Sequence, residues 1–140
     1  MTNRKLNDKA AEWICALELT GKRNEAYPHY RELFHSIVKT EATKQRRAAS
    51  AGLFLMQTDQ PAIWTKMITD EIVVYHAGNP LQQLLIYPDG TFEERIVGAD
   101  ILSGEIPQSI IPFGTWKFQR LLDPSDPESF GLFGSILIPA

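Results

Sequence analysis

The sequence predicts an all-β fold, a barrel of two antiparallel sheets with one helix before it. Two patterns lead to this prediction. Short segments rich in β-branched and aromatic residues follow one another at regular spacing, which is typical of a sandwich or barrel rather than of alternating strands and helices. Clusters of Gly, Pro, Asp and Asn separate these segments and mark the turns. The predicted strands cover Tyr30 to Val38, Ser50 to Gln57, Ile63 to Ile68, Glu71 to His76, Leu81 to Tyr87, Thr91 to Val97, Gln108 to Ile111, Thr115 to Leu122 and Phe130 to Ile138.

The helix is predicted near the start of the chain. Asn7 or Asp8 can cap its first turn, and Gly21 suits its C-terminal end. We expect Trp13 and Cys15 to pack against the rest of the domain. The apolar face that recurs at helical spacing consists of Ala10, Trp13, Ile14 and Leu17.

One turn carries a specific signal. Pro88-Asp89-Gly90 joins two apolar runs and has the residue types that a tight hairpin turn requires. No repeat or linker interrupts the sequence, so residues 1–140 are predicted to form one domain, long enough to bury about two-thirds of its unfolded surface. Residues 1–29 would form the helix and lead-in, and residues 30–138 the barrel.

Composition argues against several classes of partner. The net charge of −3 and the lack of a Lys/Arg stripe speak against nucleic acid. The densest basic run, Lys44 to Arg47, is predicted to be a solvated turn entering a strand, with a phosphate or partner contact as the alternative. No apolar run approaches the roughly 20 residues that cross a bilayer, and no secretory signal follows Met1. We therefore expect a cytoplasmic protein without a membrane partner, and the single Cys15 excludes an intrachain disulfide.

Three stretches carry a family resemblance. They run from Trp64 to Gly78, from Asn79 to Gly90 and from Gly98 to Trp116, and Arg31-Glu32 adds a shorter element on the first strand. In these stretches the sequence resembles the cupin superfamily, and more closely its Cupin_5 group, whose domains have no agreed activity. The resemblance implies an RmlC-like double-stranded β-helix, two short sheets rolled into a barrel around a ligand pocket. It also implies a homodimer formed by exchange or pairing of edge strands, which would cover those edges.

The metal-binding positions of that superfamily are altered in this sequence. Metal cupins use two histidines and a glutamate from one motif and a histidine from a second. Glu71 and Gly78 match the end of the first motif, whereas Lys117 occupies the histidine position of the second. An ammonium group cannot coordinate a metal, so we expect neither a metal nor another cofactor. The histidine positions of the first motif fall on Trp64 and Lys66 or on Thr65 and Met67.

The three histidines do not offer a replacement metal site. His76 comes five residues after Glu71 on the same predicted strand, so it faces the opposite side unless a bulge intervenes. His29 and His35 could share a face of the first strand, but in an extended chain they lie about 20 Å apart. The sequence leaves the roles of all three open.

Strand alternation places a polar set inside the barrel. Glu71, Val73 and Tyr75 face inward from one sheet, and Lys117 and Gln119 face inward from the other. Because the resemblance places Glu71 and Lys117 at ligand positions of the two motifs, we predict that they lie within salt-bridge or water-bridged distance, so that the ammonium replaces the charge of the metal. The alternative is that Lys117 leaves through the barrel mouth and Glu71 bonds to the backbone. The predicted ligand pocket comprises Glu71, Lys117, Trp64, Tyr75, Thr65 and Gln119.

Two tryptophans and two arginines have open roles. Trp64 and Trp116 flank motif positions and belong either to the barrel core or a dimer interface, or to a stacking surface for a flat or sugar-like ligand. Arg31 and Arg47 could orient an anionic group, although surface ion pairing is the simpler expectation. The glutamates considered as their partners are Glu32 and Glu41.

Three functions remain open at this point. The leading hypothesis is a metal-independent domain that binds an unidentified small polar molecule in the barrel. The second is a metal-free isomerase or epimerase of the sugar type, which needs a base and an acid on opposite sides of the substrate. His29 or His35 could be that base and Tyr75 that acid, but no catalytic residue is assigned. The third is a structural or partner-binding barrel without a ligand, in which Trp64 and Tyr75 belong to the core.

Overall fold

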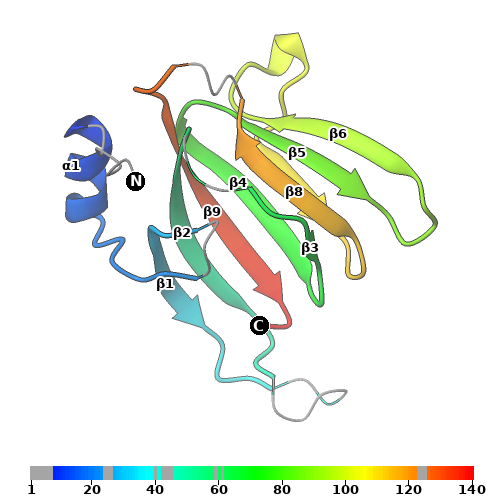
Figure 1. Ribbon diagram of the computed structural model, residues 1–140. Coiled ribbons are helices and arrows are strands. Elements are labelled where there is room, and N and C mark those ends of the chain that lie inside the picture. The colour runs from blue at the N-terminus through cyan, green and yellow to red at the C-terminus, as the bar shows by residue number, and fades with distance from the viewer. Residues whose placement is uncertain are drawn as a thin grey trace.

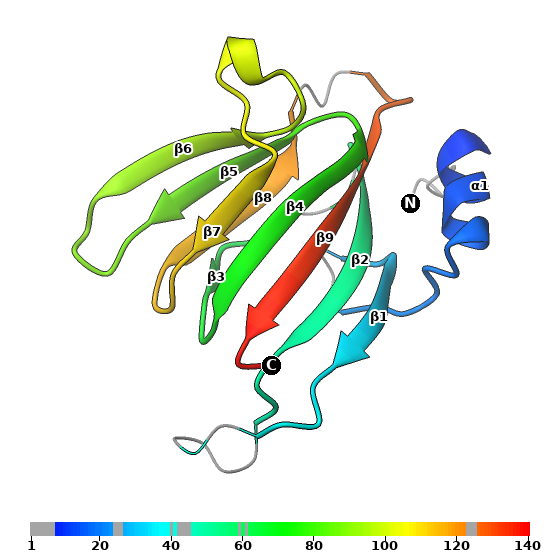
Figure 2. The same cartoon turned by 180° about the vertical axis from the view of Figure 1, so that it is seen from behind.

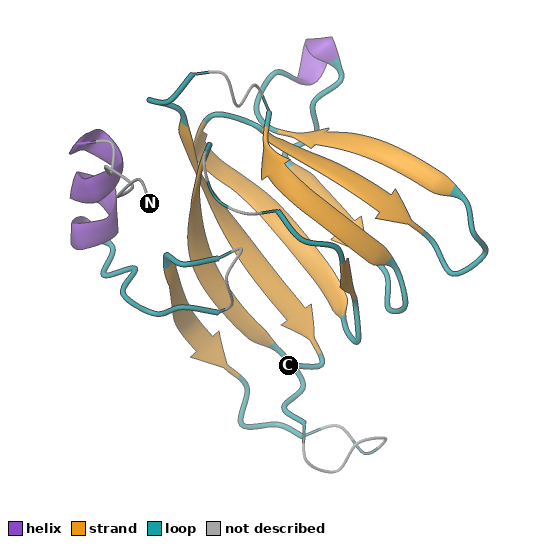
Figure 3. Ribbon diagram, viewed as in Figure 1, coloured by secondary structure: helices purple, strands orange, loops and turns teal. Residues whose placement is uncertain are grey.

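The computed structural model describes residues 8–23, 27–39, 41, 46–58, 60, 62–122 and 126–140. Within these residues, nine strands form two antiparallel sheets and one α-helix precedes them (Figures 1 and 3). The predicted all-β architecture with an N-terminal helix is confirmed. The elements are α1 (Asp8–Ala16), β1 (Tyr30–His35), β2 (Ser50–Gln57), β3 (Thr65–Lys66), β4 (Asp70–Gly78), β5 (Leu81–Ile86), β6 (Phe92–Val97), the 3₁₀ turn η1 (Ile101–Ser103), β7 (Gln108–Ile111), β8 (Trp116–Leu121) and β9 (Phe130–Ile138).

Three strands differ from the prediction by two residues or more at one or both ends. The first strand ends at His35 instead of Val38, because beyond it the chain keeps only scattered backbone contacts such as the Lys39 to Arg47 bridge. The third shrinks to two residues, because β3 pairs with β8 alone. The fourth extends to Gly78, because a bulge lets β4 continue its pairing with β9.

The two sheets face each other. The larger sheet has the order β1-β2-β9-β4-β7 and the smaller has the order β3-β8-β5-β6, so the last strand lies in the middle of the larger sheet (Figure 2). The core between them includes Val73, Leu85, Ile111 and Phe133, which are all fully buried. Side chains from opposite sheets therefore meet in the interior, and that interior contains the candidate site.

The inward side chains form layers along the barrel, as the strand registers show. One end is apolar, with Phe54, Tyr75 and Phe133 facing Leu81, Val97 and Leu121. The next layer is polar and contains Gln83, Arg95, Ser109, Gln119 and Ser135. A charged layer with Glu71 and Lys117 follows, and the alternation then leads to Thr69 and Thr115. The polar and charged interior side chains thus lie away from the Phe133 end of the barrel, among apolar ones such as Leu85 and Ile111.

The helix packs on the outer face of the larger sheet. Its buried Ala10 belongs to a cluster with Leu55, and the Trp13 ring lies edge-on to Phe130 at 5.0 Å. The expectation that Trp13 packs on the domain is confirmed. The same expectation for Cys15 is wrong, because its thiol is on the exposed side of the helix.

The helix also ends differently from the prediction. It stops at Ala16, and Glu18 adopts a left-handed backbone conformation with φ of 54° that turns the chain away. Gly21 is not the helix stop. It forms a bridge with Tyr30, where a Cβ atom would lie 2.8 Å from the Tyr30 carbonyl oxygen. Of the two proposed N-terminal caps, Asn7 lies outside the described residues.

The predicted hairpin turn is present between β5 and β6. The Gly90 amide donates to the Tyr87 carbonyl at 2.9 Å, and Gly90 has a φ of 86°, which favours glycine. Asp89 accepts a hydrogen bond from the Thr91 amide at 2.9 Å. Pro88-Asp89-Gly90 therefore forms the turn through the left-handed conformation of Gly90 and the hydrogen bond that Asp89 accepts.

The described residues of the basic run, Arg46 and Arg47, donate hydrogen bonds to backbone carbonyls of other segments. Arg46 donates to the carbonyl oxygens of Ala140 at 3.0 Å and Ile68 at 3.1 Å, and Arg47 donates to that of Ser36 at 3.0 Å. Both arginines are half-buried, so the prediction of a solvated turn is wrong for them. Residues 44 and 45 lie outside the described residues.

Among the described helices, none has the length and apolar character needed to cross a membrane.

Candidate functional site in the barrel interior

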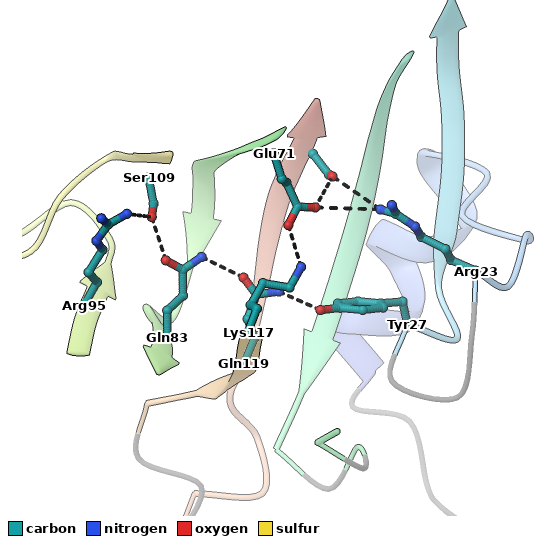
Figure 4. Close-up of polar contacts among 9 residues, drawn as sticks. Arg23, Tyr27, Glu71, Gln83, Arg95, Ser109, Lys117 and Gln119 are labelled. Atoms are coloured by element: carbon teal, nitrogen blue, oxygen red, sulfur yellow. Dashed lines mark hydrogen bonds and ion pairs between the residues drawn. The ribbon is translucent and has the colours of Figure 1, made fainter. Parts of the chain in front are cut away.

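A buried ion pair lies at the centre of the site. Glu71 on β4 and Lys117 on β8 come from opposite sheets, and Lys117 Nζ donates to Glu71 Oε1 at 2.5 Å (Figure 4). Glu71 is 1% exposed and Lys117 is 4% exposed. The two side chains therefore pair inside the barrel as the strand alternation predicted, and Lys117 does not extend into solvent.

Two further groups complete the surroundings of Glu71. Ser135 on β9 donates to Glu71 Oε2 at 2.6 Å. Arg23, from the segment between α1 and β1, places Nη1 3.8 Å from the same oxygen and 3.3 Å from Ser135 Oγ. The Arg23 side chain is 29% exposed, so it connects the buried carboxylate to the surface. We call Arg23, Glu71, Lys117 and Ser135 the charged cluster.

The electrostatics keep both partners of the pair ionised. Burial raises the pKa of Glu71, but the charge of Lys117 and the hydrogen bonds from Lys117 and Ser135 outweigh burial, so the pKa is lowered. Burial lowers the pKa of Lys117, but the charge of Glu71 outweighs it, so that pKa is raised. The interior thus holds a carboxylate and an ammonium ion near neutral pH.

A chain of hydrogen bonds crosses the barrel beside the charged cluster. Arg95 donates to Ser109 at 2.9 Å, and Ser109 donates to Gln83 at 2.6 Å. Gln83 donates to Gln119 at 2.7 Å, and Gln119 donates to the Tyr27 hydroxyl at 2.6 Å (Figure 4). The ring of Tyr27 lies 5.6 Å from Lys117 Nζ, which links this chain to the ion pair.

Two buried hydroxyls, each two residues before a member of the ion pair, have no hydrogen-bond partner among the residues that the structure describes. Thr115 is two residues before Lys117 and is fully buried, and Thr69 is two residues before Glu71 and is 4% exposed. Neither Oγ1 atom has a hydrogen-bond partner. Buried polar atoms are nearly always hydrogen-bonded, so each of these hydroxyls requires an explanation.

The structure brings together some of the predicted pocket residues. Glu71, Lys117 and Gln119 are buried in the interior, and Thr65 is half-buried opposite Lys117 in the β3–β8 register. Tyr75 lies in the apolar layer, where its ring contacts Phe133 and its hydroxyl donates to the Gly78 carbonyl at 2.7 Å. Tyr75 therefore lies away from the charged layer.

The assignment of Trp64 to the pocket is wrong. Its ring contacts Phe118 at 5.4 Å, and Phe118 alternates with the inward Lys117 and Gln119, so the contact lies on the outer face of the smaller sheet. Trp64 is 43% exposed and Trp116 on the same face is 44% exposed. Trp64 and Thr65 are consecutive, so strand alternation sends them to opposite faces, and Thr65 is the one that lies opposite the inward Lys117.

Sequence reasoning missed several interior residues. Gln83, Ser109 and Ser135 are on strands whose boundaries were predicted, so their alternation with apolar neighbours could have identified them. Arg23 and Tyr27 had no such signal, because they lie before the first strand and reach the barrel through the path of the chain.

The residues present do not fit a metal ion of the cupin type. Lys117, which the sequence resemblance placed at a ligand position, bonds through its ammonium group to Glu71. Among the described residues, no three His, Cys, Asp or Glu side chains lie close enough to hold an ion together. His35 is exposed and lies 3.6 Å from Glu32, and His76 is the exposed bulge residue of β4, near Gly134.

The two early arginines do not enter the site. Arg31 pairs with Glu18 at 3.3 Å and donates to the Leu17 carbonyl at 3.1 Å, so the expected glutamate partners were wrong for it. Arg47 bonds to a backbone carbonyl, as described above. Arg23 is the arginine that reaches the carboxylate instead.

Comparison with protein families gives one match. A family model described as "Cupin superfamily (DUF985)" matches residues 11–140. A curated relative, "Uncharacterized protein YML079W" of Saccharomyces cerevisiae, is 28% identical over 95 residues, which make up 67% of this chain and 47% of that protein. The chain therefore spans about half the length of this relative.

Two solved structures are similar over most of this chain. A hypothetical protein from Leishmania major superposes with a TM-score of 0.81 and 26% identity, covering 93% of this chain and 81% of that one. Protein SO0799 from Shewanella oneidensis superposes with a TM-score of 0.79 and 26% identity, covering 97% of this chain and 80% of that one. The two-sheet architecture is thus a double-stranded β-helix shared with these proteins.

Proposed function

The chain belongs to the Cupin_5 family of the cupin superfamily, and from this membership and the interior geometry we propose that the barrel binds a small polar molecule without a metal ion. The observation that carries the proposal is the pair of unpartnered hydroxyls on Thr69 and Thr115. An unpaired buried hydroxyl costs about 1–3 kcal/mol, and a molecule that hydrogen-bonds to both would remove that cost.

The polar interior favours binding over a purely structural role. A buried ion pair such as Glu71 with Lys117 is a weak source of stability, because desolvation offsets much of the attraction. Well-packed apolar side chains of similar volume would stabilise a barrel equally well. Charged groups in the interior are more useful for orienting a polar ligand.

The donor set supports the metal-independent part of the proposal. A cupin-type site would require Lys117 to leave Glu71 and lose its proton, whereas the surroundings raise the pKa of Lys117. The charge that an ion would supply in this place is supplied by the ammonium group. The barrel therefore orients its ligand through hydrogen bonds and charge alone.

The geometry gives less support to an epimerase. Such an enzyme needs a base and an acid around one substrate. His35 is exposed on β1 and lies beside Glu32, while the Tyr75 hydroxyl is bonded to the Gly78 carbonyl. A barrel without a ligand accounts for the fold but not for the hydroxyls of Thr69 and Thr115.

A ligand-detected NMR screen tests the proposal. The probes are small polyols, hexoses, amino acids, amides and short carboxylates, each at millimolar concentration against the metal-free protein. At least one class should show saturation transfer from the wild type and should lose it in Thr115→Val. Thr20→Val, at an exposed threonine, is the matched control and should bind as the wild type does. Absence of transfer from every probe, or equal transfer to Thr115→Val, would contradict the proposal.

A further inference from the structure

The charges around the interior site do not balance. Glu71 is one carboxylate between two cations, with Lys117 Nζ at 2.5 Å and Arg23 Nη1 at 3.8 Å. The adjacent Glu93 and Arg95 form their own pair at 3.0 Å and add no net charge. Counted over the residues that the structure describes, the site therefore has a surplus of one positive charge, part of which lies in a region with little water.

Hydrogen-bond donors also outnumber acceptors at this site. An ammonium group has three N–H donors, and one of those on Lys117 goes to Glu71. Glu71 Oε1 accepts from Lys117, and Oε2 accepts from Ser135 and faces Arg23, so both carboxylate oxygens are engaged. The Thr115 hydroxyl, next to Lys117 along β8, can still donate.

On the basis of the proposed function, we propose that the molecule bound in the barrel is a small organic carboxylate, held by the Lys117 ammonium group and the Thr115 hydroxyl. A carboxylate brings one negative charge and only acceptor oxygens, which match the surplus charge and the surplus donors. A phosphate monoester carries about −1.5 to −2 charges near pH 7, which exceeds the surplus.

Arg23 makes this binding electrostatically feasible. When Lys117 shares its donors with a ligand carboxylate, Glu71 keeps a cation at 3.8 Å and its hydrogen bond from Ser135. Without Arg23, the interior would hold two carboxylates around one ammonium ion. Arg23 is thus a positioning residue that acts through Glu71, and its partly exposed side chain also attracts anions from solvent.

Matched pairs of probes test the charge directly. Acetate is compared with acetamide, and propionate with propionamide, because each pair has nearly the same shape and differs in charge. Inorganic phosphate is the second anion. Titrations by NMR use the wild type, Arg23→Gln, Arg23→Lys and Thr115→Val, and the melting temperature of each variant shows whether it is folded.

Each carboxylate should bind at least about tenfold more tightly than its amide. A factor of this size in the dissociation constant corresponds to the free energy of one charge-assisted hydrogen bond. Arg23→Gln should lose this preference, Arg23→Lys should retain it, and Thr115→Val should weaken both probes. Equal or tighter binding of the amides or of phosphate would overturn the carboxylate assignment while leaving the proposed function in place. If none of these probes binds and the ligand-detected NMR screen is also negative, both the carboxylate assignment and the proposed function are contradicted.

Discussion

Lys117 and Glu71 come from opposite sheets and meet in the barrel interior, with Nζ 2.5 Å from Oε1. Because removal of one partner leaves the other charge buried and unpaired, Lys117→Met should lower the free energy of unfolding by about 3–5 kcal/mol. The double variant Lys117→Met with Glu71→Gln should be less destabilised than Lys117→Met alone. Urea unfolding measures both, and strictly additive effects of the two substitutions would show that the residues do not interact.

The same pair should shape the pH dependence of stability. The lowered pKa of Glu71 gives stability that is present above its unfolded value of about 4.3 and is lost as pH falls through the folded pKa. The raised pKa of Lys117 gives stability that is present below its unfolded value of about 10.4 and is lost as pH rises through the folded pKa.

The difference in unfolding free energy between the wild type and the double variant should therefore be flat from about pH 5 to pH 10 and should change on both sides. Denaturant melts of the two proteins at matched pH values provide the measurement. If the difference in unfolding free energy is the same at every pH, the pKa values of Glu71 and Lys117 are not shifted by folding.

The unpartnered threonine hydroxyl predicts an unusual mutational effect. Thr115→Val keeps the shape of the side chain and removes a polar atom without a partner, so stability should stay within about 0.5 kcal/mol or rise. Ser109→Ala is the contrasting variant, because its hydroxyl bonds to both Gln83 and Arg95, and it should cost about 1–3 kcal/mol. If Thr115→Val loses as much as Ser109→Ala, the Thr115 hydroxyl has a partner in the protein.

Metal content follows from the donor set around Lys117. Protein purified with a mild chelator step should contain well under about one transition metal ion per chain, because no cupin-type donor set remains. Elemental analysis of the wild type and of the Lys117→Met, Glu71→Gln variant gives the comparison. About one retained ion in the wild type and none in the variant would place a metal at this site after all.

The expected homodimer remains a proposal, and the outer face of the smaller sheet is the surface that suits it. Trp116, Ile86 and Phe92 lie side by side across this face, and Trp116 and Phe92 are 44% and 60% exposed.

Sedimentation at micromolar concentration should show a dimer for the wild type and a monomer for Trp116→Ser. Phe34→Ser serves as the control, because Phe34 is 57% exposed on β1, at the edge of the other sheet. A monomeric wild type, or a dimer that Phe34→Ser disrupts instead, would contradict the choice of this surface.

Much of the fold could be predicted because strands separated by turn residues leave a local signal. Pro88-Asp89-Gly90 specifies its turn through backbone conformation, and alternation placed Glu71 and Lys117 on inward faces. The pairing of these two residues could be predicted because the family resemblance places both of them at ligand positions, whereas alternation alone gives only the face.

The rest of the site depends on contacts without a local pattern. Arg23 and Tyr27 reach the interior from an irregular segment, and no periodicity describes such a segment. Trp64 was misplaced because it was assigned from its position in a motif, whereas alternation sends it to the face opposite that of Thr65. The missing partner of the Thr115 hydroxyl depends on all neighbouring atoms at once, so only the structure reveals it.

Threonine methyl groups offer the most direct test of binding inside the barrel. Protein labelled with ¹³C at the threonine methyl positions is titrated with acetate, propionate and their amides, and the spectra are recorded at each step. The account predicts that the Thr69 and Thr115 signals shift together with one dissociation constant, while the signal of the exposed Thr20 stays in place. Unchanged Thr69 and Thr115 signals at saturating probe concentration, or shifts confined to surface threonines, would contradict a ligand site in the barrel.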